Sequence, residues 1–219
     1  MKATQSCLCA ALALAAATAN AQFNLQITEI WPGNEPGSNL HEDWFEVTNK
    51  GDVAWTTADG ELYFDDVSMD VVDAVPLTGV TSIAPGESVI FYNDPASSAE
   101  FESVWANVIL PQIGLYDGSG LGQGGDGVTL FLSMGAPAGI GDIIDFEQYP
   151  DANATGGQSY NVDLAAFSTV GDAAGSLESA LANDASQYAV ASVGPAVPEP
   201  TAVLLSALAA CGVLATRRR

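Results

Sequence analysis

Short apolar segments separated by Gly, Pro, Asn and Asp recur along the chain, and this pattern limits the fold more than any other feature of the sequence. Seven segments alternate polar with apolar residues or are rich in β-branched and aromatic residues, as strands are: 25–31, 44–49, 61–65, 87–93, 105–111, 128–133 and 142–149. Helical periodicity is nearly absent, apart from 99–108, which predicts a single turn, and 176–183, which predicts a short helix with Ser176 as its N-cap. The pattern therefore predicts one all-β domain, a sandwich or barrel.

Alternation along a strand also assigns side chains to its two faces. In the first segment it predicts two opposed sets, with Leu25, Ile27, Glu29 and Trp31 on one face and Gln26, Thr28 and Ile30 on the other. In the second segment, Trp44 and Phe45 must point to opposite faces. One of these two rings is therefore expected to line an end or a second face of the sandwich, either as core packing or as an aromatic platform for a ligand.

The first residues have the features of a secretory signal. Lys2 precedes an apolar run that closes on the small-residue pattern Ala19-Asn20-Ala21, so cleavage is expected before Gln22. Cleavage there removes two of the three cysteines, and the third lies in the C-terminal apolar run. The mature protein is therefore expected to be exported and to contain no disulfide within its folded domain.

Acidic residues dominate the part expected to be exported. From Gln22 to Pro200 the chain holds all 27 Asp and Glu residues but only one basic residue, Lys50. Because phosphate groups are bound through Lys and Arg, this charge excludes nucleic acid as a partner and leaves cations and neutral polymers as ligand classes. The same charge also suits a solvated surface that keeps the domain soluble.

Four short motifs occur in a fixed order between about residues 25 and 150. They are Glu29-Ile30, Trp44-Phe45-Glu46-Val47-Thr48-Asn49, Pro85-Gly86-Glu87 and Gly125-Asp126-Gly127-Val128-Thr129-Leu130. In their order and spacing these motifs resemble the lamin tail domain. The resemblance implies an immunoglobulin-like β-sandwich, which agrees with the strand pattern, and a structural or binding module rather than an enzyme.

The last residues of the chain form a three-part pattern. Val197, Pro198, Glu199 and Pro200 precede an uncharged, mostly apolar segment, 201–216, and the chain ends in Arg217, Arg218 and Arg219. As a transmembrane helix the apolar segment spans about 24 Å, short of a hydrocarbon core of about 30 Å, and the arginines are expected to hold its end inside. The order resembles the PEP-CTERM sorting signal of Gram-negative bacteria, which implies recognition by a membrane exosortase, cleavage near the motif, and export or surface attachment.

Candidate catalytic residues are few. His41, beside Glu42 and Asp43, is the only histidine, and no nucleophile motif accompanies it. One histidine without cysteine in the exported part cannot supply a usual zinc ligand set. Paired carboxylates for the hydrolysis of glycosides stay an alternative, although no pair is singled out by the sequence.

No cofactor is expected, and calcium is the one cation that the acidic clusters favour. Hard oxygen ligands occur in two stretches, one with Asp65, Asp66, Asp70 and Asp73 and one, rich in glycine, with Asp117 and Asp126. Neither stretch matches an EF-hand loop or a glycine-rich calcium repeat, so solvated loops are the alternative. The glycine-rich stretch also lacks the helix and the basic residue that a phosphate loop needs.

These observations predict four parts: a signal peptide at 1–21, a lamin-tail-like sandwich at 22–163, an Ala/Ser/Gly-rich final segment and linker at 164–197, and the sorting signal at 198–219. Beyond Tyr160 we expect a last strand or two before the linker. The expected protein is a non-enzymatic module, anchored in the inner membrane as a precursor and then placed at the cell surface or outside the cell. Its expected role is structural, adhesive or binding, with exopolysaccharide or another envelope component as a partner. A hydrolase of extracellular polymers is the alternative.

Overall fold

A six-stranded sheet forms the centre of the molecule, with strand order β12-β11-β1-β2-β7-β8. The computed structural model describes residues 22–33, 42–155, 157–183 and 187–194. Neighbouring strands of the sheet are antiparallel except β7 and β8, which are parallel. The strands are β1 (Leu25–Trp31), β2 (Trp44–Asn49), β7 (Ser88–Tyr92), β8 (Gln112–Leu115), β11 (Tyr160–Asn161) and β12 (Ala166–Phe167).

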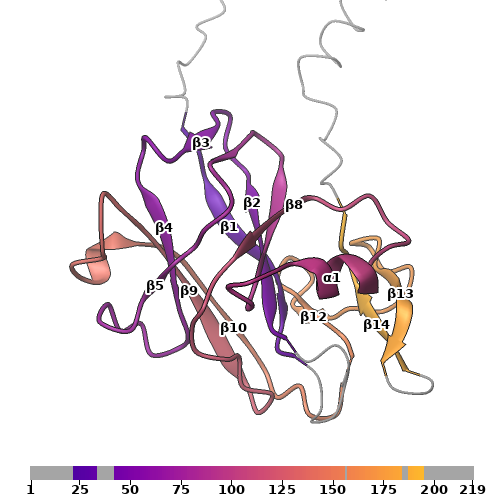
Figure 1. Cartoon of the computed structure of the whole chain (residues 1–219). Coiled ribbons are helices and arrows are strands. Elements are labelled where there is room, and N and C mark those ends of the chain that lie inside the picture. The colour runs from indigo at the N-terminus through magenta and orange to yellow at the C-terminus, as the bar shows by residue number, and fades with distance from the viewer. Residues whose placement is uncertain (1–21, 34–41, 156, 184–186, 195–219) are drawn as a thin grey trace, which may run out of the picture.

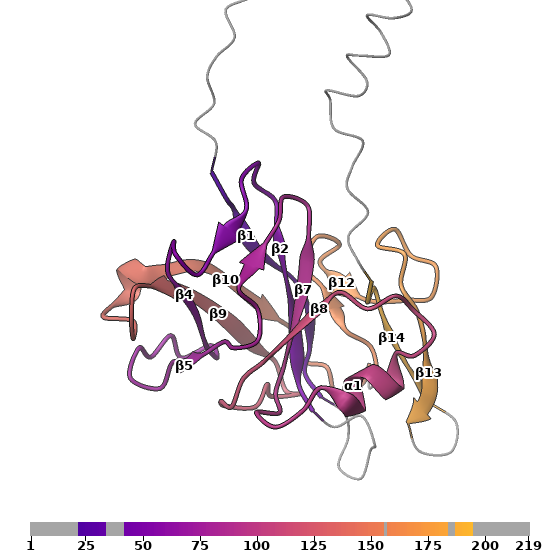
Figure 2. The same cartoon turned by 45° about the horizontal axis from the view of Figure 1, so that its top comes forward.

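A second, four-stranded sheet packs against one face of the first, with strand order β10-β9-β4-β5. Figure 1 shows this sheet as a separate layer beside β1 and β2, and Figure 2 shows the same two layers from above. Its strands are β4 (Glu61–Asp65), β5 (Val75–Pro76), β9 (Asp126–Ser133) and β10 (Ile143–Tyr149), with a 3₁₀ turn, η1 (Ile140–Asp142), before β10. Two short strands, β3 (Trp55–Thr56) and β6 (Ser82–Ile83), pair with each other. The all-β sandwich predicted from the strand pattern is therefore confirmed.

The main hydrophobic core lies between the two sheets. Phe45 of β2, Phe64 of β4 and Phe91 of β7 are almost fully buried there, and the rings of Phe45 and Phe64 stack 5.2 Å apart. Burying a side chain of this size contributes roughly 1.5–3 kcal/mol relative to leaving it exposed. Along β2, Phe45 and Val47 face this core whereas Trp44 faces away from it, so the faces of β2 are as predicted.

A β-bulge changes the predicted faces of β1. The register between β1 and β2 shifts between Ile27 and Glu29, so that Thr28 is an extra residue opposite β2. Ile30 therefore points into the main core, whereas Trp31 belongs to the cluster on the outer face. The prediction that placed Glu29 and Trp31 on the same face as Ile27 is wrong, because strict alternation does not continue through a bulge.

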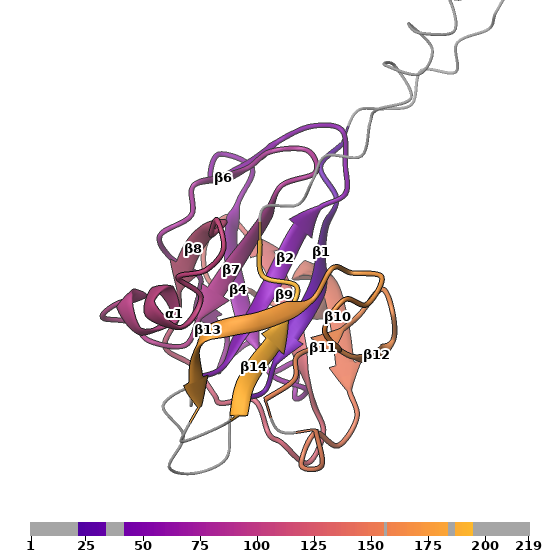
Figure 3. The same ribbon diagram turned by 90° about the vertical axis from the view of Figure 1, so that its right-hand side faces the viewer.

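The outer face of the six-stranded sheet carries a third layer. It consists of helix α1 (Ala99–Val104) and the hairpin of β13 (Leu177–Asn183) and β14 (Gln187–Ala191). Figure 3 shows the hairpin lying across β1 and β2. A second hydrophobic cluster fills this interface, with the large buried side chains Trp31, Trp44, Ile90, Tyr92, Phe101 and Trp105. Trp44, not Phe45, is thus the ring on the second face.

Two segments differ from their predicted structure. The predicted strand at 105–111 is not formed, because Trp105 ends helix α1 and its ring packs in the outer cluster. The predicted helix at 176–183 is strand β13, since pairing with β14 and the burial of Ala189 and Ala191 outweigh its weak helical tendency. The predicted single turn around 99–108 is helix α1.

The segment 164–197, expected to be a final segment and linker, contributes three strands within its described residues. Strand β12 extends the six-stranded sheet, and the hairpin of β13 and β14 covers the outer face. Val193, beyond β14, is still only 4% exposed. The packed part of the chain therefore extends about thirty residues past the boundary predicted at 163.

Candidate functional site

An aromatic pocket opens at one end of the outer face. Trp31 ends β1, Trp44 begins β2 and Tyr92 ends β7. Because these neighbouring strands are antiparallel, the three rings lie side by side at the same end of the sheet. Helix α1 and its C-cap add Phe101 and Trp105, and all five rings line the pocket. Trp31 and Trp44 lie parallel with their centroids 6.0 Å apart, and Phe101 meets Trp44 edge-on at 5.7 Å.

Two carboxylates complete the lining of the aromatic pocket. Glu42 precedes β2, and Glu100 lies in the first turn of α1. The hydroxyl of Tyr92 donates a hydrogen bond to Oε2 of Glu100 over 3.3 Å. Burial, followed by the charges of Glu100 and Glu42, raises the pKa of the Tyr92 hydroxyl. The pocket therefore combines aromatic surface with negative charge.

A pair of buried carboxylates lies further along the same face. Glu29 and Glu46 are directly opposite each other on β1 and β2, and they are 0% and 7% exposed. Glu29 accepts hydrogen bonds from three serine hydroxyls, those of Ser159, Ser168 and Ser192, and from the backbone N–H of Ser192 at 2.9 Å. Burial raises the pKa of Glu29, while these donors act in the opposite direction.

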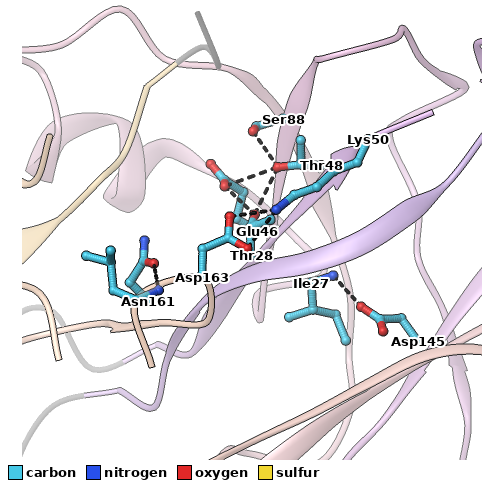
Figure 4. Close-up of polar contacts among 10 residues, drawn as sticks. Ile27, Thr28, Glu46, Thr48, Lys50, Ser88, Asp145, Asn161 and Asp163 are labelled. Carbon is cyan, nitrogen blue, oxygen red and sulfur yellow. Dashed lines mark hydrogen bonds and ion pairs between the residues drawn. The ribbon is translucent and has the colours of Figure 1, made fainter. Parts of the chain in front are cut away.

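Glu46 has weaker hydrogen-bond support than Glu29. Its Oε1 accepts from the Thr28 hydroxyl at 2.5 Å and from the Thr48 hydroxyl at 3.4 Å, and Thr48 is in turn bonded to Ser88 at 2.7 Å. Figure 4 shows this row of polar side chains running across β1, β2 and β7. Burial, and next the charge of Glu29, raise the pKa of Glu46 to about 8.

This pair is one candidate for the paired carboxylates of the hydrolase alternative. Both side chains are buried, and the hydrogen-bond donors around them belong to the protein itself. A general acid or base must reach the proton it transfers, directly or through one water. The burial of Glu29 and Glu46 therefore favours a structural role for the pair.

The acidic clusters predicted as calcium ligands mostly accept hydrogen bonds within turns. Asp65 accepts from Ser68 and from the backbone N–H of Asp70, and Asp66 accepts from the N–H of Ser68. Asp126 accepts hydrogen bonds from the backbone N–H of Gly122 and, weakly, from that of Val67. The bond from Val67 joins the two acidic stretches. Within the described ranges, no three His, Cys, Asp or Glu side chains are arranged to hold a metal ion. Calcium stays a prediction.

Most of the site residues predicted from the sequence lie outside the described residues. These are Ala19 and Ala21 of the signal, His41, the motif from Val197 to Pro200, the apolar segment 201–216, and Arg217, Arg218 and Arg219. Gln22, the expected first mature residue, is exposed, and its N–H donates to Asp52 at 2.8 Å. In the described part of the chain, no helix has the length and apolar character to cross a bilayer.

The aromatic pocket was only partly predictable from the sequence. The opposed faces of Trp44 and Phe45 indicated a ring on a second face, and that signal was correct. Trp31 reaches the pocket only because of the bulge in β1, and Phe101 and Trp105 come from a helix too short for a periodic pattern. No local signal connected Glu42 with Glu100, which are brought together by the tertiary fold.

Searches against protein-family models, curated proteins and solved structures gave no significant match to this chain.

Proposed function

We propose that this protein is an exported, non-enzymatic β-sandwich module of the lamin-tail, immunoglobulin-like type, with a structural, adhesive or binding role at the cell surface or in the extracellular matrix. A signal peptide cleaved before Gln22 directs it outward. The C-terminal segment then acts as a transmembrane helix in the inner-membrane precursor until an exosortase-type enzyme cleaves near Pro198-Glu199-Pro200. The sequence motifs at both ends of the chain support this route.

One observation carries the binding role. Three neighbouring strands carry aromatic residues at the same end of the large sheet, and α1 with its C-cap adds two more rings, so that a pocket lined also by two carboxylates forms there. The buried pair Glu29 and Glu46, by contrast, has its hydrogen-bonding capacity used by the protein itself. A recognition site therefore fits the arrangement of side chains better than a hydrolytic site does.

The substitution Glu199→Ala in the native host tests the proposal. We expect the variant to accumulate in the membrane as an unprocessed precursor, because the sorting motif is changed while the folded domain is not. Glu178→Ala, an exposed position on β13, serves as the matched control and should be processed like the wild type. Intact-mass analysis of the fractions measures both ends of each chain.

Two results would contradict the proposal. Mature wild-type protein that still ends in Arg219 would reduce the C-terminal segment to an ordinary anchor. Turnover of the host's own exopolysaccharide by the purified mature protein would instead favour the hydrolase alternative.

A further inference from the structure

The turn that follows β10 carries a pattern of residues that the proposed function does not use. Its sequence is Asp151-Ala152-Asn153-Ala154-Thr155. Asn153 is the one asparagine of the sequence that has Ser or Thr two residues after it, and the residue between the two is not proline. In exported proteins this spacing of Asn and Ser or Thr is the acceptor pattern for N-linked glycans. The pattern therefore indicates a modification site wherever the fold leaves it accessible.

The fold presents this turn at the surface of the molecule. Asp151, Asn153 and Ala154 are all exposed. Ala152 between them is only 4% exposed, and its N–H donates a hydrogen bond to the carbonyl oxygen of Gln123 at 2.7 Å. The turn is thus anchored at Ala152, and the side chain of Asn153 lies on the outside of the domain, where a modifying enzyme can reach it.

The polar groups of the turn surround the carboxamide of Asn153. Oδ1 of Asp151 accepts hydrogen bonds from the backbone N–H of Asn153 at 2.9 Å and from its Nδ2 at 2.8 Å. Donation to a carboxylate polarises the N–H bond and leaves more electron density on the nitrogen. The hydroxyl of Thr155 donates to the carbonyl oxygen of Ala152 at 3.1 Å, a bond that it can exchange for one to an enzyme. The turn therefore orients Nδ2 and favours its attack on an electrophilic carbon.

We propose that Asn153 is the acceptor of an N-linked glycan, which a membrane oligosaccharyltransferase adds from an oligosaccharide joined through a diphosphate to a lipid carrier. In this reaction Nδ2 of Asn153 forms a bond to the anomeric carbon of the first sugar, while the bond from that carbon to the diphosphate oxygen breaks. The lipid diphosphate leaves with the electron pair, and one proton of Nδ2 passes to a base of the transferase. The inference goes beyond the proposed function and rests on it only for the export of the domain.

Mass spectrometry of the protein produced in its native host tests this assignment. Intact-mass analysis gives both ends of the chain and the mass of any adduct, and fragmentation of the peptide that contains Asn153 locates the adduct. Three variants are compared with the wild type: Asn153→Gln removes the acceptor, Thr155→Ala removes only the hydroxyl, and Thr155→Ser keeps it. Asn24→Gln is the matched control, because Asn24 is exposed and has no Ser or Thr two residues after it.

We expect the wild type to carry an adduct at Asn153 whose mass is a sum of sugar residues. Asn153→Gln and Thr155→Ala should lose this adduct, because the first lacks the acceptor nitrogen and the second lacks the hydroxyl that the transferase recognises. Thr155→Ser and Asn24→Gln should keep the adduct. The far-UV circular dichroism of each variant checks that the fold is retained, so that loss of the adduct is not a result of unfolding.

The other outcomes overturn the inference. An unmodified Asn153 in chains that begin at Gln22 would overturn it and leave the proposed export route intact. Chains that keep residues 1–21 and an unmodified Asn153 would overturn both, so the two failures are distinguishable. An adduct that persists in Asn153→Gln would lie on another residue. An adduct that persists in Thr155→Ala would show a transfer that does not recognise the pattern of Asn and Thr, and would exclude the proposed class of transferase.

Discussion

At the scale of single residues, Glu46 is one of the buried carboxyl groups that make stability depend on pH. Its pKa is raised from 4.5 to about 8, so between these values the folded state keeps a proton that the unfolded state has lost. Its contribution to stability is therefore fully present below about pH 4.5, falls as the pH rises, and is lost above about pH 8. Asp43 acts in the same direction, since burial raises its pKa to about 7.

We predict that Glu46→Gln reduces this loss of stability. The amide keeps an acceptor for Thr28 and stays neutral. Between pH 5 and pH 8 the free energy of unfolding of the variant should therefore fall by roughly 2–4 kcal/mol less than that of the wild type. Urea unfolding at both pH values measures the difference, and Glu178→Gln is the exposed control. If the free energy of unfolding falls equally in the wild type and in Glu46→Gln, the raised pKa of Glu46 is contradicted.

Ser192 is a second residue with a testable role. It donates to Glu29 through both its N–H and its hydroxyl, the latter at 2.6 Å. Ser192→Ala leaves a buried carboxylate with one donor fewer, and we expect it to lower the free energy of unfolding by about 1–3 kcal/mol. Ser103→Ala, whose hydroxyl donates to a backbone carbonyl on the exposed side of α1, should change stability by about 0.5 kcal/mol or less. Denaturant unfolding of both variants measures these changes. Equal changes in the free energy of unfolding would contradict the role of Ser192.

At the scale of elements, the parallel pair of β7 and β8 depends on one glycine. A Cβ at Gly114 would lie 2.5 Å from the ring of Phe91 and 2.7 Å from the carbonyl oxygen of Thr78. The Phe91 ring is buried in the main core, and the Thr78 carbonyl accepts a hydrogen bond from Leu115. Neither neighbour is free to move away without loss of packing or pairing.

We predict that Gly114→Ala destabilises the domain by about 1–3 kcal/mol, because β8 must shift away from β7. Gly124→Ala is the control, since its Cβ would meet nothing within 4 Å. Thermal unfolding should separate the two variants clearly. Wild-type stability in Gly114→Ala would mean that β8 is not held as closely as described.

The elements differ in how well the sequence predicted them. The long strands β1, β2 and β4 were predicted residue for residue, because a buried face imposes period-two alternation over five residues or more. The bulge in β1 could not be predicted, since its extra residue is set by the partner strand. Beyond Tyr160 the sequence predicted a last strand or two without their positions, and it predicted a helix where β13 lies, because the Ala and Ser residues of this hairpin have no strong preference. Pairing with β14 and packing in the outer cluster favour the strand. The carboxylates of the pocket come from distant segments, so only the fold could bring them together.

At the scale of the whole molecule, the third layer is part of the folding unit. Its hairpin covers the outer cluster, and Ser168 and Ser192 supply donors to the fully buried Glu29. We predict that a chain of residues 22–163 does not unfold cooperatively, whereas residues 22–194 do. Differential scanning calorimetry of both chains measures this. A sharp transition in the shorter chain would contradict it.

The bonds between Ser192 and Glu29 have a mechanical consequence. Ser192 lies two residues before Gly194, the last described residue, and Glu29 lies on β1, with strands on both sides of it in the six-stranded sheet. A pulling force applied at the carboxyl end of the domain is therefore transmitted to the middle of the large sheet instead of to an edge strand. The bonds from Ser192 to Glu29 bear the first load, because Ser192 lies between the pulled end and the hairpin. A domain of this kind under tension resists until these bonds break, since the hairpin is shielded from the load while they hold.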